Sequence, residues 1–241
     1  MNKYIITVSL LIFNVTLFGQ INNGRVIYKK QFSKKIFTKK NTKEHTFKKF
    51  SNIEKKMTES QNKIKYSLRF TKDASIYEII KSLKIKNDLS YELSADNSVY
   101  YTSKKESIKQ TEVMGDVFLV SKKKTQWKLI NETKKIGKFN CLKATTSIEK
   151  KINGKIKKLI KIAWYTPEIN VPFGPIGYHG LPGLIIELID GNYKYKAIKI
   201  ELNTHKNRSI SPPTKGKKIS EIEMNALVSK MWGEIKNNRR F

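Results

Sequence analysis

The chain has 241 residues, of which 39% are hydrophobic and 29% are charged, and its single cysteine excludes an intramolecular disulfide. It carries 49 Lys and Arg against 20 Asp and Glu, which gives a formal net charge of +29. Such a surplus favours anionic partners, namely membrane headgroups, acidic glycans or nucleic acid, although a merely solvated basic surface is the alternative. We expect no nucleic-acid partner, because no recognised binding motif is present and the basic residues are spread along the chain.

The first 20 residues predict a secretory signal peptide. A short positive region, Met1-Asn2-Lys3, precedes the uncharged and mostly apolar stretch Tyr4–Phe18, and Gly19 offers a small residue for cleavage. This stretch is short for a membrane span, and no other apolar run approaches such a length. We therefore expect an exported protein that is periplasmic, outer-membrane-associated or secreted, with a retained anchor as the alternative.

Apolar periodicity then predicts a series of strands and one helix. Val26, Tyr28, Phe32 and Ile36 share one parity, and so do Ile64, Tyr66, Leu68 and Phe70, as in strands with one buried face. Between these two patterns, Thr42–Ser60 places Phe47, Phe50, Ile53 and Met57 at helical spacing among lysines. The further strand candidates are Ser75–Leu83, Ser98–Ser103, Gly115–Ser121 and Gln126–Ile130.

Two hairpins and a terminal helix complete the predicted elements. Asn153-Gly154 joins strands at Cys141–Ile152 and Lys155–Thr166, and Asp190-Gly191 joins strands at Leu184–Ile189 and Tyr193–Leu202; both dipeptides suit tight turns. Arg208–Lys218 is the predicted linker into a helix that has capping-box spacing at Ser220 and Glu223. Its stripe of Met224, Leu227, Val228, Met231 and Ile235 predicts docking on its own sheet rather than on a partner.

These elements predict a mainly β fold of about eight to ten strands. We expect a curved antiparallel sheet or half-open barrel with one or two flanking helices that cover its concave side, with an α+β arrangement as a variant. The expected organisation is a signal peptide at 1–20, a β-rich domain at 21–207, and a linker with the C-terminal helix at 208–241.

One segment departs from the composition of the rest. Ile162–Tyr193 contains no Lys or Arg, where a window of this length would hold about six at the average frequency of the chain. Within it, Val171–Leu184 holds three prolines and four glycines, which forbid a regular helix or a central strand. Leu181-Pro182-Gly183-Leu184 fits a type II turn, and the strand that follows is apolar on both faces. We therefore expect this segment to fold inward against the sheet.

The same segment resembles a known family. Gly180-Leu181-Pro182-Gly183-Leu184-Ile185 is similar to the signature of the GLPGLI family of exported proteins, found mainly in Bacteroidetes. Trp127-Lys128-Leu129, Gly174-Pro175 and Ala163–Ile169 extend the resemblance, which covers about Trp127 to Asp190. It implies an exported, β-rich cell-envelope protein of a family without an established activity, and so leaves the function open.

Candidate site residues come from this segment. They form a candidate ligand-binding or structural loop, with no assigned catalytic residue: Trp164, Gly174, Pro175, Tyr178, His179, Gly180, Leu181, Pro182 and Gly183. No metal is expected, because His45, His179 and His205 lack the spacing of metal ligands, and no cofactor is expected, because Gly177–Gly183 matches neither a phosphate loop nor a Rossmann motif. Cys141 is interpreted as a small buried residue, with a reactive thiol or an intermolecular bridge as the alternatives.

Three functional hypotheses remain open from the sequence. The leading one is a non-enzymatic envelope protein that binds a lipid-like, apolar or amphipathic ligand, or an outer-membrane protein partner, while its basic exterior lies near an anionic membrane surface. The second is a hydrolase that uses His179 or the pair Glu168 and Glu187, although solvation of one carboxylate and pairing of the other with lysine is the simpler interpretation. The third is a structural partner of an outer-membrane complex, reached through the C-terminal helix.

Overall fold

A computed structural model describes residues 23–33, 44–81, 94–152, 155–203 and 209–238. The predicted signal peptide, Ile36, His205 and the Asn153-Gly154 turn lie outside this part of the chain, as do the side chains of His45, Phe47 and Phe50. Within the described residues, no helix has both the length and the apolar character that a membrane span requires.

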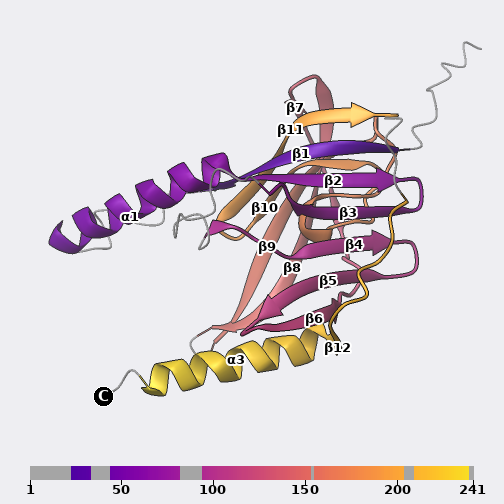
Figure 1. Cartoon of the computed structure of the whole chain (residues 1–241). Helices are drawn as coiled ribbons and strands as arrows, with labels where there is room; N and C mark the ends of the chain where they lie inside the picture. Colours follow the sequence, from indigo (N-terminus) through magenta and orange to yellow (C-terminus); the bar gives the residue numbers. More distant parts are fainter. Residues whose placement is uncertain (1–22, 34–43, 82–93, 153–154, 204–208, 239–241) are drawn as a thin grey trace, which may run out of the picture.

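The described residues form one sheet of twelve strands in the order β12-β6-β5-β4-β3-β2-β1-β11-β10-β9-β8-β7 (Figure 1). All neighbours are antiparallel except β12 and β6, which are parallel. The predicted mainly β, curved sheet is confirmed, and the sheet is not closed into a barrel. Its strands are β1 (Asn23–Phe32), β2 (Lys65–Thr71), β3 (Ala74–Ile79), β4 (Val99–Ser103), β5 (Ser107–Val113), β6 (Asp116–Ser121), β7 (Lys128–Ile136), β8 (Phe139–Ile152), β9 (Lys155–Thr166), β10 (Leu184–Asp190), β11 (Tyr193–Leu202) and β12 (Lys217–Ser220).

Both predicted hairpins are present, with one difference at the second turn. Strand β10 runs through Asp190, which pairs with Tyr193, so the loop consists of Gly191 and Asn192. Of these, only Gly191 has a positive φ, 60°. Asp190 therefore belongs to the extended strand, and its side chain takes part in the site described below.

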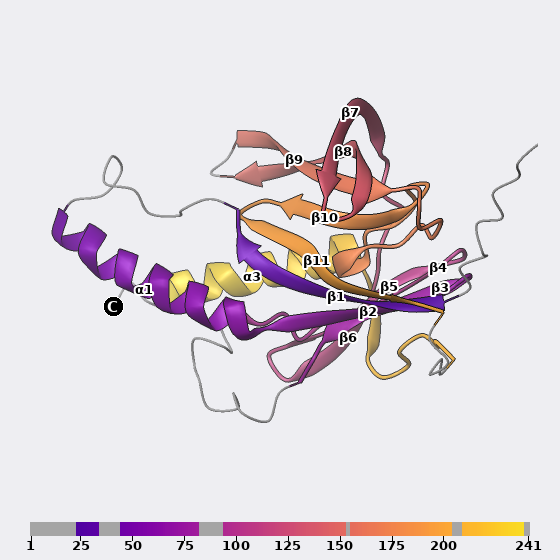
Figure 2. The ribbon, with the colours of Figure 1, turned by 90° about the horizontal axis from the view of Figure 1, so that it is seen from above.

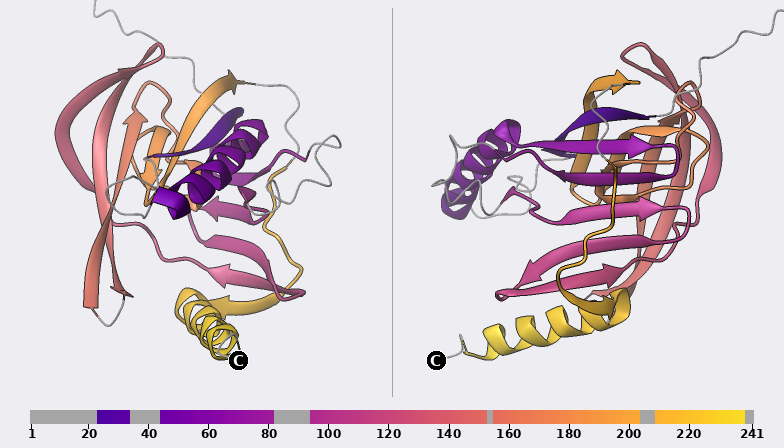
Figure 3. Two further views of the ribbon diagram at one scale, coloured as in Figure 1. Left: turned by 90° about the vertical axis from the view of Figure 1, so that its left-hand side faces the viewer. Right: turned by 45° about the vertical axis from the view of Figure 1, so that its right-hand side comes forward.

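The two helices flank the sheet but do not cover its concave side, so that part of the prediction is wrong. Helix α1 (Glu44–Lys63) projects beyond the ends of β1 and β2, and α3 (Glu221–Asn238) runs along the β12–β6 edge (Figures 1 and 3). The predicted capping box of α3 is confirmed, since Glu223 Oε2 accepts from Ser220 N at 2.8 Å and Glu223 N donates to Ser220 Oγ at 3.2 Å. Met224 packs this helix onto Phe118 and Val120 of β6.

The concave side is filled instead by the segment between β9 and β10, residues 167–183, which we call the inner loop. Seen from above, it lies between the wing formed by β1–β6 and the wing formed by β8–β10 (Figure 2). Its apolar side chains join both wings in one core, and they are Ile169, Val171, Phe173, Ile176, Tyr178 and Leu181. Each is less than 9% exposed. The predicted inward fold of the lysine-free segment is thus confirmed.

Candidate functional site

Hydrogen bonds to strand β10 hold the inner loop in place. Leu184 N donates to Ile169 O at 3.0 Å, and Ile185 N donates to Phe173 O at 3.0 Å. These bonds satisfy backbone groups that burial would otherwise leave without partners. The predicted type II turn is not formed, because Gly183 has a φ of +152° instead of about +80° and Leu184 N bonds to Ile169 rather than to Leu181. Instead, Gly183 N donates to Leu181 O at 2.8 Å, which makes a three-residue turn centred on Pro182.

Two glycines of the inner loop are required by close packing. A Cβ atom on Gly183 would lie 2.6 Å from the carbonyl carbon of Thr166 and nearer still to its oxygen, and the φ of Gly183 is +152°. At Gly174, a Cβ would lie 2.8 Å from Cβ of Ile185. Only glycine allows the loop to approach β9 and β10 this closely.

The tip of the inner loop is strained and is held by a lysine from another segment. Ile176 has φ 48° and ψ 33°, a left-handed conformation that is unusual for a β-branched residue. Its carbonyl accepts from Lys122 Nζ at 3.2 Å. The ammonium lies 5.5 Å from the ring centre of Tyr100 and 5.3 Å from that of Tyr178. Burial lowers the pKa of Lys122 below its ordinary value.

A carboxylate joins the loop tip to strand β9. Asp190 Oδ2 accepts from Tyr178 Oη at 3.0 Å and from Lys161 Nζ at 2.9 Å. Burial raises the pKa of the Tyr178 phenol, and the nearby negative charge of Asp190 raises it further. The phenol therefore stays protonated and acts as a hydrogen-bond donor to Asp190.

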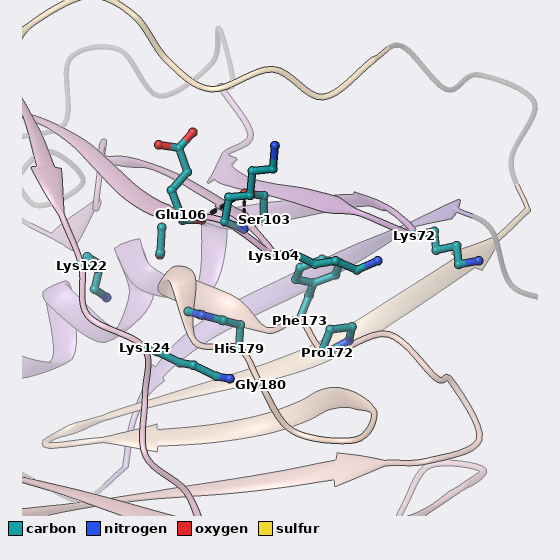
Figure 4. A pocket seen from close by; sticks show the side chains of 12 residues that line it. Lys72, Ser103, Lys104, Glu106, Lys122, Lys124, Pro172, Phe173, His179 and Gly180 are labelled. Atoms are coloured by element: carbon teal, nitrogen blue, oxygen red, sulfur yellow. Dashed lines mark hydrogen bonds between the residues drawn. The ribbon is translucent and has the colours of Figure 1, made fainter.

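A basic pocket of about 380 Å³, which we call the first pocket, opens beside the loop tip (Figure 4). Lys122 and Lys124 lie at one end and Lys72 at the other, with His179 on the wall between them. Five lysines and one glutamate line it, so their net charge is +4: Lys72, Lys104, Lys105, Lys122, Lys124 and Glu106. The sequence window around the inner loop gave no sign of this charge, because all five lysines come from other segments.

His179 is partly buried in the wall of this pocket. Its Nδ1 lies 3.0 Å from Gly177 O, so a backbone carbonyl occupies that nitrogen. Burial lowers the pKa of His179, the Gly177 carbonyl opposes this, and the charges of Lys122 and Lys124 lower it further. The ring is therefore neutral at pH 7, and its other nitrogen is left to interact with a ligand.

Two further pockets adjoin the first. The second pocket, of about 470 Å³, contains Tyr178, Lys161 and Asp190 together with Lys109 and Glu221. The third, of about 330 Å³, lies beside Trp127 and Pro182. Lys122 lines both the first and second pockets, and Lys124 lines all three.

The structure divides the candidate residues into three groups. Tyr178, His179, Gly180, Leu181 and Pro182 each line at least one of these pockets. Gly174, Pro175 and Gly183 are buried, and Gly174 and Gly183 pack closely against neighbouring strands.

Trp164 stands apart from the loop tip. It pairs with Lys143 and Glu187 across the sheet, so it lies on the face opposite to that of its neighbour Tyr165. Its ring is 5.2 Å from Nζ of Lys134. The tryptophan that does reach the loop is Trp127, whose Nε1 donates to His179 O at 2.8 Å; the sequence had placed it only within the resemblance.

The two carboxylates considered for acid–base chemistry each have a partner of their own and are not paired with each other. Glu187 is 4% exposed and pairs with Lys134 at 2.9 Å. Glu168 is exposed and accepts from Asn140 N at 2.8 Å. One carboxylate paired with lysine and one solvated is the arrangement of the simpler sequence interpretation. Cys141 is fully buried, and burial raises the pKa of its thiol to about 11.

Metal binding finds no support among the residues that the structure describes, since they include no group of three or more His, Cys, Asp or Glu placed to hold an ion. The groups that the pockets do offer are ammonium donors, neutral hydroxyls and amides, aromatic rings and a few carboxylate acceptors. Such a set suits the binding of a polar, anionic molecule.

Comparisons with known proteins show similarity of fold but indicate no activity. Two crystal forms of PNGF-II, in space groups C2 and P21, match with TM-scores of 0.50 and 0.51 at 18% identity. The match covers 87% of this chain but only 33% of PNGF-II, so the chain spans about a third of that protein's length. An uncharacterised conserved protein from Thermus thermophilus gives a TM-score of 0.33 at 7% identity, over 83% of this chain and 91% of that one.

No curated protein matches the sequence. A family model does match residues 148–187, which contain the second half of the β8–β9 hairpin, the inner loop and the start of β10. That family is described as a protein of unknown function, Porph_ging, and this part of the chain is similar to it.

Proposed function

We propose that this protein is a non-enzymatic binding protein for an anionic ligand, which it holds in the first pocket at the tip of the inner loop. The observation that carries the proposal is the convergence of five lysines on a pocket of about 380 Å³ that contains a single carboxylate. Lysine ammoniums are point charges that bind phosphate, sulfate and carboxylate groups.

The charge of this pocket is poorly compensated. Within the described part of the chain, Lys104 pairs with Asp73 at 3.0 Å, whereas Lys72, Lys105, Lys122 and Lys124 form no ion pair. Like charges held together repel, so a bound anion would relieve the repulsion and gain several ammonium contacts at once. Because Lys122 is half-buried, its contact with an anion would be screened less by salt than a fully exposed contact.

Titration calorimetry on the purified chain would test this proposal, with inorganic phosphate, sulfate, citrate and galacturonate as probes at low and physiological salt. We expect at least one probe to bind. Replacing Lys105 by Gln should weaken that binding about fivefold, the factor for the loss of about 1 kcal/mol. Lys65→Gln is the matched control, because Lys65 is an exposed lysine of β2 outside the pockets. Failure of all four probes to bind, or an equal effect of the two substitutions, would overturn the proposal.

A second candidate function follows from a pocket elsewhere on the molecule. It has a volume of about 310 Å³ and lies between the β7–β8 turn and β11. Ile136, Phe139, Ile186 and Ile200 contribute an apolar lining, and Lys138 lies at the turn. This arrangement supports binding of an anionic amphipath such as a short fatty acid. The inner loop fills the concave side of the sheet, so we place a lipid-like ligand here rather than inside the curve.

Decanoate and decanol would test the amphipath site by calorimetry. We expect decanoate to bind more tightly than decanol, and Ile200→Asn to abolish both interactions while the protein stays folded by circular dichroism. If neither probe binds, the amphipath site is excluded, and the proposal for the anion pocket is unaffected.

We further propose that the chain is an exported member of the GLPGLI family. The matched residues 148–187 contain both Ala163–Ile169 and Gly180–Ile185, on which the resemblance depends, and the composition of residues 1–20 supports export. Mass spectrometry of the protein from a Bacteroidetes host should find a mature N-terminus near residue 21 in the envelope or medium. A full-length chain retained in the cytoplasm would contradict export.

A further inference from the structure

The three pockets at the inner loop are adjacent parts of one surface. Segment 122–127, which connects β6 to β7, contributes residues to all three, and so does the inner loop through Ile176 and residues 178–182. Lys122 and Lys124 line both the first and the second pockets, and Lys124 and Gly180 line both the first and the third. An extended ligand could therefore occupy several pockets without leaving the surface.

The second pocket differs from the first in its mixture of charges. Lys109, Lys122 and Lys161 lie within 5.7 Å of the ring centres of Tyr100 or Tyr178. Beside these cations are two carboxylates, Asp190 and Glu221, and the neutral polar side chains of Thr125, Gln126, Thr146, Ser147 and Asn225.

This mixture selects among anionic ligands. Sulfate and the polymers of phosphate or sulfate present acceptors to the lysines but almost no donors to the carboxylates, and free phosphate adds few hydroxyl donors, so the carboxylates would repel all of them. A uronic acid presents a carboxylate to the lysines and several hydroxyl donors to the carboxylates, together with an apolar ring face that suits an aromatic side chain. An acidic peptide of equal charge offers only its backbone N–H as a donor in each residue.

We infer that the ligand is a linear acidic oligosaccharide that spans the first and second pockets across Lys122, an inference that rests on the anion-binding function proposed above. The first pocket holds one acidic sugar residue, and the next residues follow past Lys122 toward Lys109 and Asp190. Each pocket has a volume suited to one or two sugar rings.

The experiment compares ligands of different length on the full chain and its variants. The probes are galacturonic acid, its linear trimer and hexamer, and hexaglutamate. Lys105 lines only the first pocket and Lys109 only the second, so Lys105→Gln and Lys109→Gln report on each pocket separately, with Lys65→Gln as the control. Thermal unfolding confirms that every variant is folded before it is titrated.

We expect the hexamer to bind at least about tenfold more tightly than the monomer, because contacts in the second pocket are gained within one molecule. Lys109→Gln should weaken hexamer binding about fivefold and leave monomer binding unchanged, whereas Lys105→Gln should weaken both.

Four outcomes would overturn the inference. Equal affinity of monomer and hexamer, with no effect of Lys109→Gln, rejects the extended site but leaves the first pocket as an anion site. Hexaglutamate that binds as tightly as the hexamer rejects the saccharide in favour of an acidic peptide. If galacturonate and its oligomers fail to bind while phosphate binds at Lys105, only this inference fails; if no anion binds at all, the proposed function fails with it.

Discussion

Replacement of Gly183 by Ala tests the central feature of the fold, the docking of the inner loop against β9 and β10. The new Cβ would lie 2.6 Å from the Thr166 carbonyl carbon and 3.0 Å from Pro167 N, at a φ of +152° that side chains rarely adopt. Both neighbours are backbone atoms, so no rotamer change relieves the clash. The strained conformation costs about 1–3 kcal/mol and the overpacking a similar amount, so we expect a loss of about 4 kcal/mol in the free energy of unfolding.

Two further glycine substitutions separate the contribution of backbone strain from that of overpacking. Gly137 has a φ of +60° and no atom within 4 Å of the position that a Cβ would take, so Gly137→Ala should cost only about 1–2 kcal/mol for its left-handed backbone. Gly233 lies in α3 with open space around it, so Gly233→Ala should stabilise the protein by up to about 1 kcal/mol.

Thermal unfolding followed by circular dichroism measures all three effects. For a chain of this size, about 4 kcal/mol corresponds to a fall in Tm of about 8–16 °C. From the highest Tm to the lowest, the order should be Gly233→Ala, wild type, Gly137→Ala and Gly183→Ala. A Gly183→Ala protein that melts within about 2 °C of wild type, or level with Gly137→Ala, would show that the loop is not packed as described.

Three more predictions follow from buried polar groups. N-ethylmaleimide should alkylate Cys141 at least about 100-fold more slowly in the native protein than in guanidinium, because burial excludes the reagent and raises the thiol pKa to about 11; equal rates would contradict its burial. Lys134→Met should cost about 1–3 kcal/mol in denaturant unfolding by leaving Glu187 unpaired, and Glu187→Leu added to it should recover most of that loss; additive losses would refute the pairing. Burial raises the pKa of Tyr28 and Tyr178 above that of a tyrosine in the unfolded chain, which titrates near pH 10. The contribution of these protonated phenols to the free energy of unfolding is therefore complete below pH 10 and is lost progressively as the pH rises above it. The free energy of unfolding should therefore fall by about 1.4 kcal/mol per pH unit for each buried tyrosine, less steeply in Tyr178→Phe, and a flat profile from pH 9 to 11 would contradict this.

Local patterns predicted most strands because their information lies in adjacent residues. The alternation of Tyr66, Leu68 and Phe70 requires one buried face, and all three side chains are at most 1% exposed. Strand β5 was missed because Ser107–Val113 is polar on both faces, with only two apolar residues. Strand β12 was missed because its four residues follow a proline-rich stretch and pair in parallel with β6, a contact that no local signal encodes.

The position of the helices could not be read from their apolar stripes. A stripe shows that a helix has a face to bury, but the surface that receives it depends on what already covers the sheet. Here the inner loop fills the concave side, so α1 is left beyond the strand ends with Ile53 42% exposed. Helix α3 finds a smaller apolar surface on β6, next to the strand that leads into it.

The candidate site shows the same limit in its charges. The lysine-free window identified the loop correctly, since a segment buried on the concave side cannot carry unpaired ammonium groups. The lysines that make its tip a binding surface come from the β2–β3 turn, the β4–β5 turn and the segment after β6, which only the fold brings together. Sequence spacing has no signal for such a cluster in a chain where lysine is common everywhere.

The distribution of acids in the lysine-free window explains why the pocket stays basic. Each of its three acids already has a partner: Glu187 pairs with Lys134, Asp190 pairs with Lys161, and Glu168 accepts from Asn140 N. The loop therefore supplies no free carboxylate to neutralise the lysines around its tip. The repulsion among these lysines destabilises the folded protein, and binding of an external anion would remove this destabilisation. Affinity at this site should accordingly fall with added salt more steeply than a single ion pair would, whichever anion occupies it.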